Sequence, residues 1–341
     1  ILEANIIDMD MAKKNNISDV LLDRLFLDES RLDNIISGVY NIINLEDPIG
    51  SEIKRWKPSN GIDMCQTRVP IGVIGIIYES RPNVTADAST LALKSGNCII
   101  LRGGSESFYS SSAIINSIKN GLKSSQLSED CVNMVNTIDR DAVGLLLNMH
   151  KYVNLIIPRG GKALIERVQI DSKIPVLSHL DGLCHTYIDV DANKEMAINI
   201  VLNAKMRRTG ICGATETLLC HKDVIINILP DIINKLIEQG CEIRADKNIK
   251  VLNHNIKNAT IEDWQTEYLD KILSIKTVEN VSDAIKHIEK FGSNHTDAII
   301  TDNKQTAEIF LKEVNSAIVL HNASTQYADG GEFGMGAEMG I

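Results

Sequence analysis

Along the chain, stretches with apolar residues at helical spacing alternate with short extended apolar segments. Each change from one pattern to the other marks the start of a predicted element. Residues 18–50 carry apolar side chains at helical spacing and end in the turn sequence DPIG. Residues 51–69 contain two extended segments around Asn60-Gly61, a dipeptide that favours a β-hairpin. We therefore expect helices at the start of the chain, followed by a two-stranded ribbon.

From Pro70 onward the pattern repeats a strand and then a helix. The run IGVIGIIYES predicts a buried strand, and Val84, Ala88, Leu91 and Ala92 mark one face of the helix after it. Three further units of this kind include the strands NCIILRGGS, CVNMVNTI and VNLIIPRGG. Four such alternations indicate an α/β fold with a parallel sheet covered on both faces, whose ligands bind beyond the carboxyl ends of the strands.

A second α/β region is predicted after Asp191. The segment NKEMAINIVLNAKMRR has apolar positions at helical spacing, and Gly210 is placed to end the helix. The segment TETLLCHKDVI then predicts a strand. This places Cys212 on the connection between helix and strand, whereas Cys220 is expected to pack inside the sheet.

Length and charge narrow the possible functions. A chain of 341 residues exceeds the size at which single cores stop growing, about 250 to 300 residues, so two domains are expected. The formal charge of -10 repels nucleic acid, and no apolar run approaches the roughly 18 residues of a membrane span. The seven isolated cysteines are typical of reduced thiols. We expect a soluble, cytoplasmic protein that binds neither nucleic acid nor membrane.

Two predicted strands end in the same tripeptide, Arg102-Gly103-Gly104 and Arg159-Gly160-Gly161. Glycine lets the backbone approach a ligand, a following helix offers amides to phosphate oxygens, and arginine adds a bidentate donor. The alternative is that the turns need glycine for conformational reasons alone. No G-x-G-x-x-G follows any strand, so a dinucleotide would bind here in a different mode from the common Rossmann one.

Cys212 stands between Gly210 and Gly213, just after Arg207 and Arg208. Arginines and backbone amides would stabilise a thiolate, while the negative end of the preceding helix opposes them. The sequence therefore leaves a nucleophile and a buried small side chain both open. Packing roles are expected at five other cysteines, namely Cys65, Cys98, Cys131, Cys220 and Cys241.

Six separated segments resemble the γ-glutamyl phosphate reductases, also called glutamate-5-semialdehyde dehydrogenases, of the aldehyde dehydrogenase superfamily. They run in consistent order from about Glu3 to Ile341 and read PIGVIGIIYESRPNVTADASTLALKSGNCIILRGGSES, LIIPRGGKALI, SHLDGLCHTYIDVD, GICGATETLL, HTDAIITDN and GGEFGMGAEMGI. The resemblance implies an aldehyde dehydrogenase-like fold with a doubly wound parallel-sheet cofactor domain at 1–50 and 70–181. It also implies an oligomerisation hairpin at 51–69 and an α/β catalytic domain at 182–341, with the family's first helices and last segment missing.

The implied activity is NADPH-dependent reduction of L-glutamyl 5-phosphate to L-glutamate 5-semialdehyde and phosphate, the second step of proline biosynthesis from glutamate. The resemblance implies a thioacyl-enzyme on Cys212, a homo-oligomer, and glutamate 5-kinase as a candidate partner in the pathway. Gly213 stands where the family commonly has asparagine. The open alternatives are another acylating aldehyde dehydrogenase, such as a CoA-acylating one, and a truncated, inactive homologue that still binds nucleotide.

The resemblance also assigns site residues. Catalysis falls to Cys212 and to Asn83, placed where the superfamily stabilises the oxyanion, although Asn83 would also suit a helix N-cap. His179 stands where hydrolytic relatives have a glutamate that activates water. The residues expected to hold NADPH are Arg102, Gly103, Gly104, Ser105, Glu106, Arg159, Gly160, Gly161 and Glu267.

The substrate side is expected to be lined by His179, Asp181, His185 and Arg207. The alternatives are a core role for the histidines and a solvated position for Arg207. His179, Cys184 and His185 also suggest zinc, but a tetrahedral site needs a fixed ligand cluster and no second cluster completes this one. We therefore expect no metal.

Overall fold

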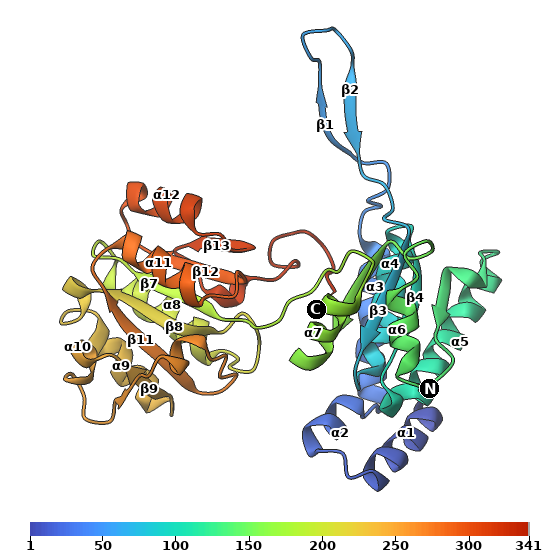
Figure 1. The fold of residues 1–341 in the computed structure, drawn as a ribbon, viewed down its shortest axis with the longest axis horizontal. Helices are drawn as coiled ribbons and strands as arrows, with labels where there is room; N and C mark the ends of the chain where they lie inside the picture. Colours follow the sequence, from blue (N-terminus) through green and yellow to red (C-terminus); the bar gives the residue numbers. More distant parts are fainter. Residues whose placement is uncertain (340–341) are drawn as a thin grey trace. The chain divides into compact units, whose positions relative to one another are not determined.

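The structure is a computed structural model that describes residues 1–339 (Figure 1). The chain forms two compact units, one comprising Ile1–Ser178 and the segment from Gly334, the other His179–Phe333. The observed boundary between Ser178 and His179 lies three residues before the expected one at 181/182. The final segment, expected in the second domain, belongs to the first unit, because Met339 packs against that unit's apolar core and Gly336 lies against Leu45.

The first unit is built on a four-stranded parallel sheet in the described part of the chain. Its strands lie in the order β5-β4-β3-β6, with β3 Val73–Tyr78, β4 Cys98–Arg102, β5 Val132–Met134 and β6 Leu155–Arg159. The chain moves outward from β3 through β4 to β5 and then returns to the other side of β3. This reversal places the carboxyl ends of β3 and β6 side by side, where doubly wound sheets bind ligands.

Helices cover both faces of this sheet, as the alternating pattern predicts. One apolar cluster joins the strands to α4 (Pro82–Lys94) and α5 (Phe108–Ser124). A second cluster joins the other face to α6 (Asp141–Leu147) and α7 (Lys162–Asp171). Val84, Ala88 and Ala92 are buried in the first cluster, so the predicted apolar face of α4 is confirmed.

Three N-terminal helices, α1 (Leu2–Lys14), α2 (Asp19–Leu25) and α3 (Glu29–Asn44), pack on this unit. Buried polar side chains dock α1 onto the start of α5. The Asn5 amide donates to Ser110 Oγ at 3.0 Å, and Asp8 accepts from the Ser110 amide at 2.7 Å and from its hydroxyl at 2.6 Å. Because buried polar groups need partners, these bonds fix the position of α1.

A hairpin of β1 (Glu52–Trp56) and β2 (Met64–Thr67) projects from the first unit (Figure 1). Its strands pair antiparallel, and Gly61 adopts φ +82° in the connection, a left-handed conformation that glycine tolerates without strain. Every strand residue is exposed. The predicted ribbon is therefore present, and it lies outside the core.

The second unit holds a seven-stranded parallel sheet in the described residues. The order of its strands is β10-β9-β11-β8-β7-β12-β13. Their bounds are β7 Cys184–Ile188, β8 Thr215–His221, β9 Glu242–Ala245, β10 Lys257–Asn258, β11 Ile272–Val278, β12 Thr296–Ile300 and β13 Ile318–His321. The predicted strand after Cys212 is β8, and Cys220 is buried within it.

Helices again cover both faces of the sheet. One apolar cluster contains residues of α8 (Lys194–Met206), α9 (Leu229–Glu238) and α10 (Lys247–Lys250), and the opposite cluster contains residues of α11 (Val281–Phe291) and α12 (Lys304–Glu313). Short 3-10 helices occupy connections in both units: η1 Ser105–Ser107, η2 Glu129–Cys131, η3 Lys222–Val224, η4 Glu262–Gln265 and η5 Thr325–Tyr327. Of the helices that residues 1–339 form, none combines the length and apolar character needed to cross a membrane.

Candidate active site

Cys212 lies in the loop that joins α8 to β8, where the sequence placed it. α8 ends at Met206, and a turn closed by the Ala214 amide and the Ile211 carbonyl, 3.0 Å apart, leads into the strand. The Cys212 side chain is exposed, whereas Cys184, Cys220 and Cys241 in the same unit are buried. Cys212 is thus the accessible thiol among the described cysteines of this unit.

Two glycines hold the backbone of this loop close to its neighbours. A Cβ atom at Gly182 would lie 2.7 Å from Cys212 Cα and 2.8 Å from its Cβ. One at Gly213 would lie 3.2 Å from the Thr325 carbonyl oxygen. Gly182 also donates its amide to Glu267 Oε1 at 2.9 Å. The segment before β7 therefore packs closely against the Cys212 loop, and its hydrogen bond to Glu267 helps to hold it there.

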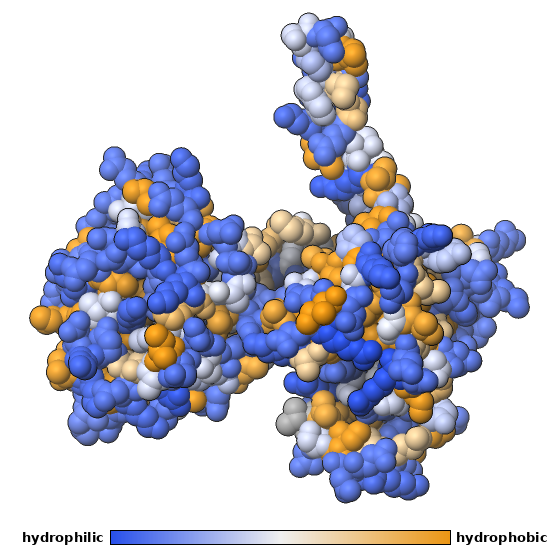
Figure 2. All heavy atoms as spheres, viewed as in Figure 1, coloured by the Kyte–Doolittle hydropathy of each residue, from blue (hydrophilic) through white to orange (hydrophobic). Residues whose placement is uncertain are grey.

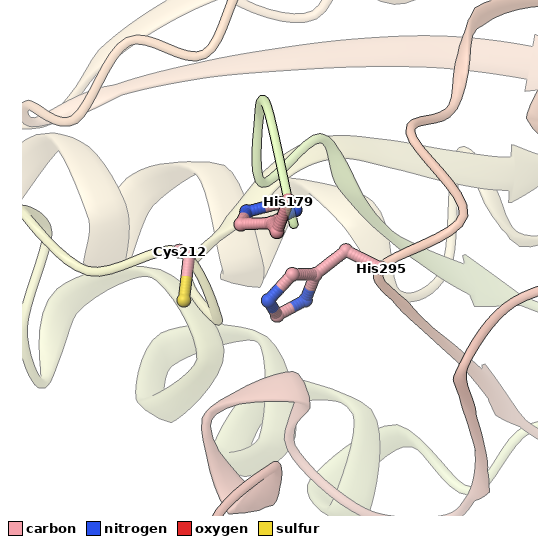
Figure 3. A group of neighbouring side chains, drawn as sticks. All are labelled: His179, Cys212 and His295. Atoms are coloured by element: carbon pink, nitrogen blue, oxygen red, sulfur yellow. The ribbon is translucent and has the colours of Figure 1, made fainter. Parts of the chain in front are cut away.

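Two imidazoles stand beside Cys212, from His179 before β7 and from His295 just before β12 (Figure 3). A ligand atom of each histidine and the Cys212 sulfur all lie within 4.8 Å of one another, and the two ring centroids are 4.6 Å apart. His295 Nδ1 lies 2.9 Å from Thr296 Oγ1. The Cys184 thiol donates to the Cys212 carbonyl at 3.0 Å and lies 3.5 Å from His295 Nδ1.

Both imidazoles are uncharged at neutral pH. Burial lowers the pKa of His179, although the carboxylate of Asp181 opposes the shift. Burial, and then repulsion from His179, lowers the pKa of His295 to about 4, against the pull of Asp297. Each ring therefore carries one nitrogen with a free lone pair, which can accept a proton weakly or bind a metal ion.

The expected substrate residues do not all gather at Cys212. His185 is 1% exposed, and its Nδ1 lies 2.9 Å from Asp297 Oδ1 inside the unit. Successive side chains of a strand point to opposite faces, so β7 turns Cys184 toward the Cys212 loop and His185 away from it. The core interpretation of His185 fits the structure, and the substrate role does not. Asp181 is half-buried beside Gly182, and Arg207 is exposed just after α8.

A buried ion pair lies under the Cys212 loop. Lys205 on α8 and Glu216 on β8 are 0% and 1% exposed, and Lys205 Nζ donates to Glu216 Oε2 at 2.5 Å. The other oxygen of Glu216 accepts the Leu269 amide at 3.2 Å. Burial raises the pKa of Glu216 to about 7, although Lys205 opposes the shift. The pair ties the two elements that flank the loop.

In the first unit, the turn after β6 forms a hydrogen bond with the side chain of Glu79. Gly161 is the N-cap of α7, and its amide donates to Glu79 Oε2 at 3.0 Å. A Cβ at Gly160 would lie 2.7 Å from the same carboxyl group. A carboxyl oxygen thus lies at the N-terminus of α7, where β3 and β6 end side by side. The backbone amides of a helix N-terminus are a typical place for an anionic group.

The turn after β4 is organised differently. Arg102 is 7% exposed and donates to the carbonyl of Gly103 and to those of Ile138 and Asp139, the last two at 3.0 and 3.2 Å. Its Nε is buried with no partner among the described residues. Arg102 therefore holds loops together, while Ser105 and Glu106 lie nearer the surface, with Ser105 Oγ donating to Glu106 Oε1 at 3.2 Å.

Asn83 is the second residue of α4, whose N-cap is Arg81. The N-cap interpretation of Asn83 is therefore wrong. Its amide donates to Asp87 Oδ2 at 3.1 Å, and both side chains line a cavity of about 270 Å³ together with Arg24 and Arg31. Burial raises the pKa of Asp87, although the Asn83 bond opposes the shift. The Asn83 amide thus lies at a cavity of the first unit that both charged and apolar side chains line.

Sequence reasoning missed three residues of these two sites: Glu79, Lys205 and His295. His295 begins the segment HTDAIITDN, which carried part of the family resemblance, so the signal was present but no role was drawn from it. Glu79 and Lys205 carry no local pattern that separates them from surface charges.

The two doubly wound units and the exposed thiol on a helix-to-strand loop agree with the comparison with known families. The model described as Aldehyde dehydrogenase family matches residues 39–265. The chain belongs to the aldehyde dehydrogenase family, and it is an oxidoreductase.

More specific relatives are the gamma-glutamyl phosphate reductases. The chain is 52% identical to that of Paramagnetospirillum magneticum over 341 residues, all of this chain and 81% of the relative, and 51% identical to that of Rhodospirillum rubrum over 98% of this chain and 78% of the relative. The crystal structure of the gamma-glutamyl phosphate reductase from Thermotoga maritima is similar, with a TM-score of 0.95 and 42% identity over 100% of this chain and 82% of that one. The resemblance seen in the sequence is thus confirmed.

Proposed function

We propose that this chain reduces L-glutamyl 5-phosphate to L-glutamate 5-semialdehyde and phosphate, the second step of proline biosynthesis from glutamate. The observation that carries the proposal is the exposed thiol of Cys212, held by Gly182 in a chain that is 52% identical to gamma-glutamyl phosphate reductases over its whole length. An acyl phosphate needs a nucleophile at its carbonyl, and a thiolate is the strongest one that proteins offer at neutral pH.

Cys212 forms the covalent intermediate. Its sulfur attacks the γ-carbonyl carbon, the C–O bond to phosphate breaks, and phosphate leaves with the bonding electrons, so that a thioester remains on Cys212. Backbone amides of the 210–214 loop are the proposed donors to the oxyanion. Asn83, expected in this role from the resemblance, belongs to the first unit, where its amide donates to Asp87. When a nicotinamide cofactor is bound, it supplies the hydride that reduces the thioester. Cys212 then leaves as the carbonyl re-forms, and the free thiol returns.

In this proposal, the two uncharged imidazoles accept the proton that the Cys212 thiol releases. His179 and His295 have nitrogens within 4.8 Å of the Cys212 sulfur, and such contacts often tighten only when substrate binds. Burial lowers the pKa of both rings, so each accepts the thiol proton only briefly. A weak base at His179 also activates water poorly, and this protects the thioester from hydrolysis.

The first unit is the proposed cofactor domain. The Gly160-Gly161 turn fits a pyrophosphate oxygen, since Glu79 already places a carboxylate at the Gly161 amide. Ser105 and Glu106 are the proposed partners of the adenosine ribose. Arg102, one of the residues that the resemblance assigns to the cofactor, is the proposed source of the preference for NADPH. Glu267, expected at the nicotinamide ribose, accepts the Gly182 amide. Its proposed effect on the cofactor site is therefore indirect, through the position of the Cys212 loop.

The hairpin is the proposed oligomerisation arm. Ile53, Ile62 and Met64 are exposed on it, and Figure 2 shows apolar side chains among the polar ones along its length. An isolated two-stranded ribbon is marginally stable in water, so a second copy of the chain is the partner we propose. The seven cysteines, isolated from one another in the sequence, support a reducing compartment. We extend the proposal to the cytoplasm, with glutamate 5-kinase as the pathway partner.

The test is the reverse reaction: reduction of NADP⁺ by L-glutamate 5-semialdehyde, with and without phosphate. We expect turnover that requires phosphate in the intact protein and a loss of at least about a thousandfold in Cys212→Ala. Cys65→Ser, which removes an exposed thiol on the hairpin, is the matched control and should keep full activity. Turnover with acyl-CoA but not with phosphate plus semialdehyde would contradict the proposed substrate.

A further inference from the structure

The side chains of His179, Cys212 and His295 converge on one point of the second unit, although they come from three different loops (Figure 3). Cysteine sulfur and imidazole nitrogen are the donors that zinc prefers. We propose that these three residues form a binding site for Zn²⁺, which reversibly blocks the Cys212 sulfur. The ion replaces the thiol proton, which passes to solvent, so that no oxidant or reductant is needed.

The spacing of the donor atoms suits a small tetrahedral ion. They lie within 4.8 Å of one another, while zinc bonds of about 2.0 to 2.3 Å place tetrahedral ligands roughly 3.5 Å apart. A contraction of about 1 Å closes the difference. Cys212 is exposed on its loop and both histidines are half-buried, so rotation of side chains supplies this movement without a change in the sheet.

The surroundings of His295 prepare it as a ligand. Its Nδ1 lies 2.9 Å from Thr296 Oγ1. A proton on Nδ1, donated to this hydroxyl, leaves Nε2 with its lone pair free for a metal ion. Second partners of this kind are typical of zinc-binding histidines, because they fix the tautomer and the orientation of the ring.

Three protein ligands leave the fourth position of the ion open for water. Cys184 is the nearest further thiol on β7, but it is buried and donates to the Cys212 carbonyl at 3.0 Å. Its sulfur is committed to that carbonyl and is not among the three donors that lie within 4.8 Å of one another, so Cys184 does not complete the set. The exposed side of Cys212 provides the entry path for the ion.

The site differs from the one that the sequence suggested and then disfavoured. That group paired His179 with Cys184 and His185, and β7 turns His185 into the core beside Asp297. His295 lies 83 positions beyond Cys212 in the chain, so the fold alone brings the third ligand into place.

Cobalt(II) is the probe for the test, because it occupies zinc sites and gives an absorption band when bound to thiolate. Titration of the intact, reduced protein should show one ion and a thiolate-to-cobalt band, and Zn²⁺ should displace it. The band should vanish in Cys212→Ala, and affinity should fall by at least about tenfold in His179→Asn and in His295→Asn. His254→Asn, an exposed histidine of the same unit, and Cys65→Ser are matched controls that should bind normally.

A titration without a thiolate band, or one unchanged in both His179→Asn and His295→Asn, would overturn the site. The optical measurement needs no turnover, so it gives its answer even if the proposed reaction is wrong. The blocking role rests on the proposed function, and its own readout is inhibition of turnover by Zn²⁺ that a chelator reverses. Undiminished turnover with zinc bound at Cys212 would overturn that role.

Discussion

Gly182 is the residue that presses most closely on the nucleophile loop. We expect Gly182→Ala to lower kcat by about a hundredfold, because the added Cβ would lie 2.7 Å from Cys212 Cα and would push the sulfur out of line by roughly 1 Å. Steady-state kinetics and a thermal melt of the same preparation measure the change.

The matched control is Gly121→Ala, at a glycine inside α5 where a Cβ meets nothing within 4 Å. It should keep full activity and gain up to about 1 kcal/mol of stability from helix propensity. Equal activity of Gly182→Ala and Gly121→Ala would show that the close approach has no catalytic role.

At the residue scale, the glycine-flanked segment between a helix and a strand placed Cys212 on a connecting loop, and only the family resemblance made it the expected nucleophile. The same reasoning placed His185 at the substrate, since neighbouring residues in SHLDGLCHTYIDVD look alike before the register of β7 is known. Strand register decides which of Cys184 and His185 faces the loop. His295 was not assigned a role, because its contact with Cys212 is a tertiary one.

The elements on either side of Cys212 are joined by the buried pair of Lys205 on α8 and Glu216 on β8. We expect Lys205→Met to destabilise the second unit by about 3 to 5 kcal/mol, because Glu216 would remain buried without its partner. A urea unfolding curve followed by fluorescence would show the shift in midpoint.

The double variant Lys205→Met/Glu216→Leu separates the charge from the packing. It should recover most of the lost stability, since an apolar pair replaces an ion pair of similar volume without leaving a buried charge. If the double variant is as unstable as Lys205→Met, the loss comes from packing rather than from the unpaired carboxylate.

The elements themselves were largely predictable from the sequence. Short continuous apolar runs followed by amphipathic helices predicted β3, α4, β4 and α5, because a strand covered on both faces is apolar throughout and each covering helix has one apolar face. The order of the strands was not predictable, since every parallel strand reads as the same buried run. The sites depend on that order, because it sets Glu79 after β3 beside Gly161 after β6.

On the scale of the whole molecule, the hairpin stands out because every residue of its two strands is exposed in a single chain. We expect replacement of residues 52–67 by a short Gly-Ser linker to lower the mass of the particle in sedimentation velocity. The reason is that Ile53, Trp56 and Met64 lose the second copy that covers them in the proposed oligomer. Far-UV circular dichroism should stay nearly unchanged, since both sheets lie outside the hairpin.

Ile226→Lys, which places a charge at an exposed apolar position of the second unit, is the control and should leave the mass unaltered. An equal particle mass with and without the hairpin would show that the hairpin does not contribute to oligomerisation.

The return of the chain to the first unit at Gly334 also has a consequence for the order of synthesis. Because Met339 packs against a core whose residues lie between positions 74 and 157, the first unit emerges from the ribosome early but gains this contact only after the second unit has been made. The second unit, continuous from His179 to Phe333, can fold while the first still lacks its closing segment. A nascent chain halted shortly before Gly334 would thus present one finished unit and one with part of its apolar core uncovered, a natural client for a chaperone.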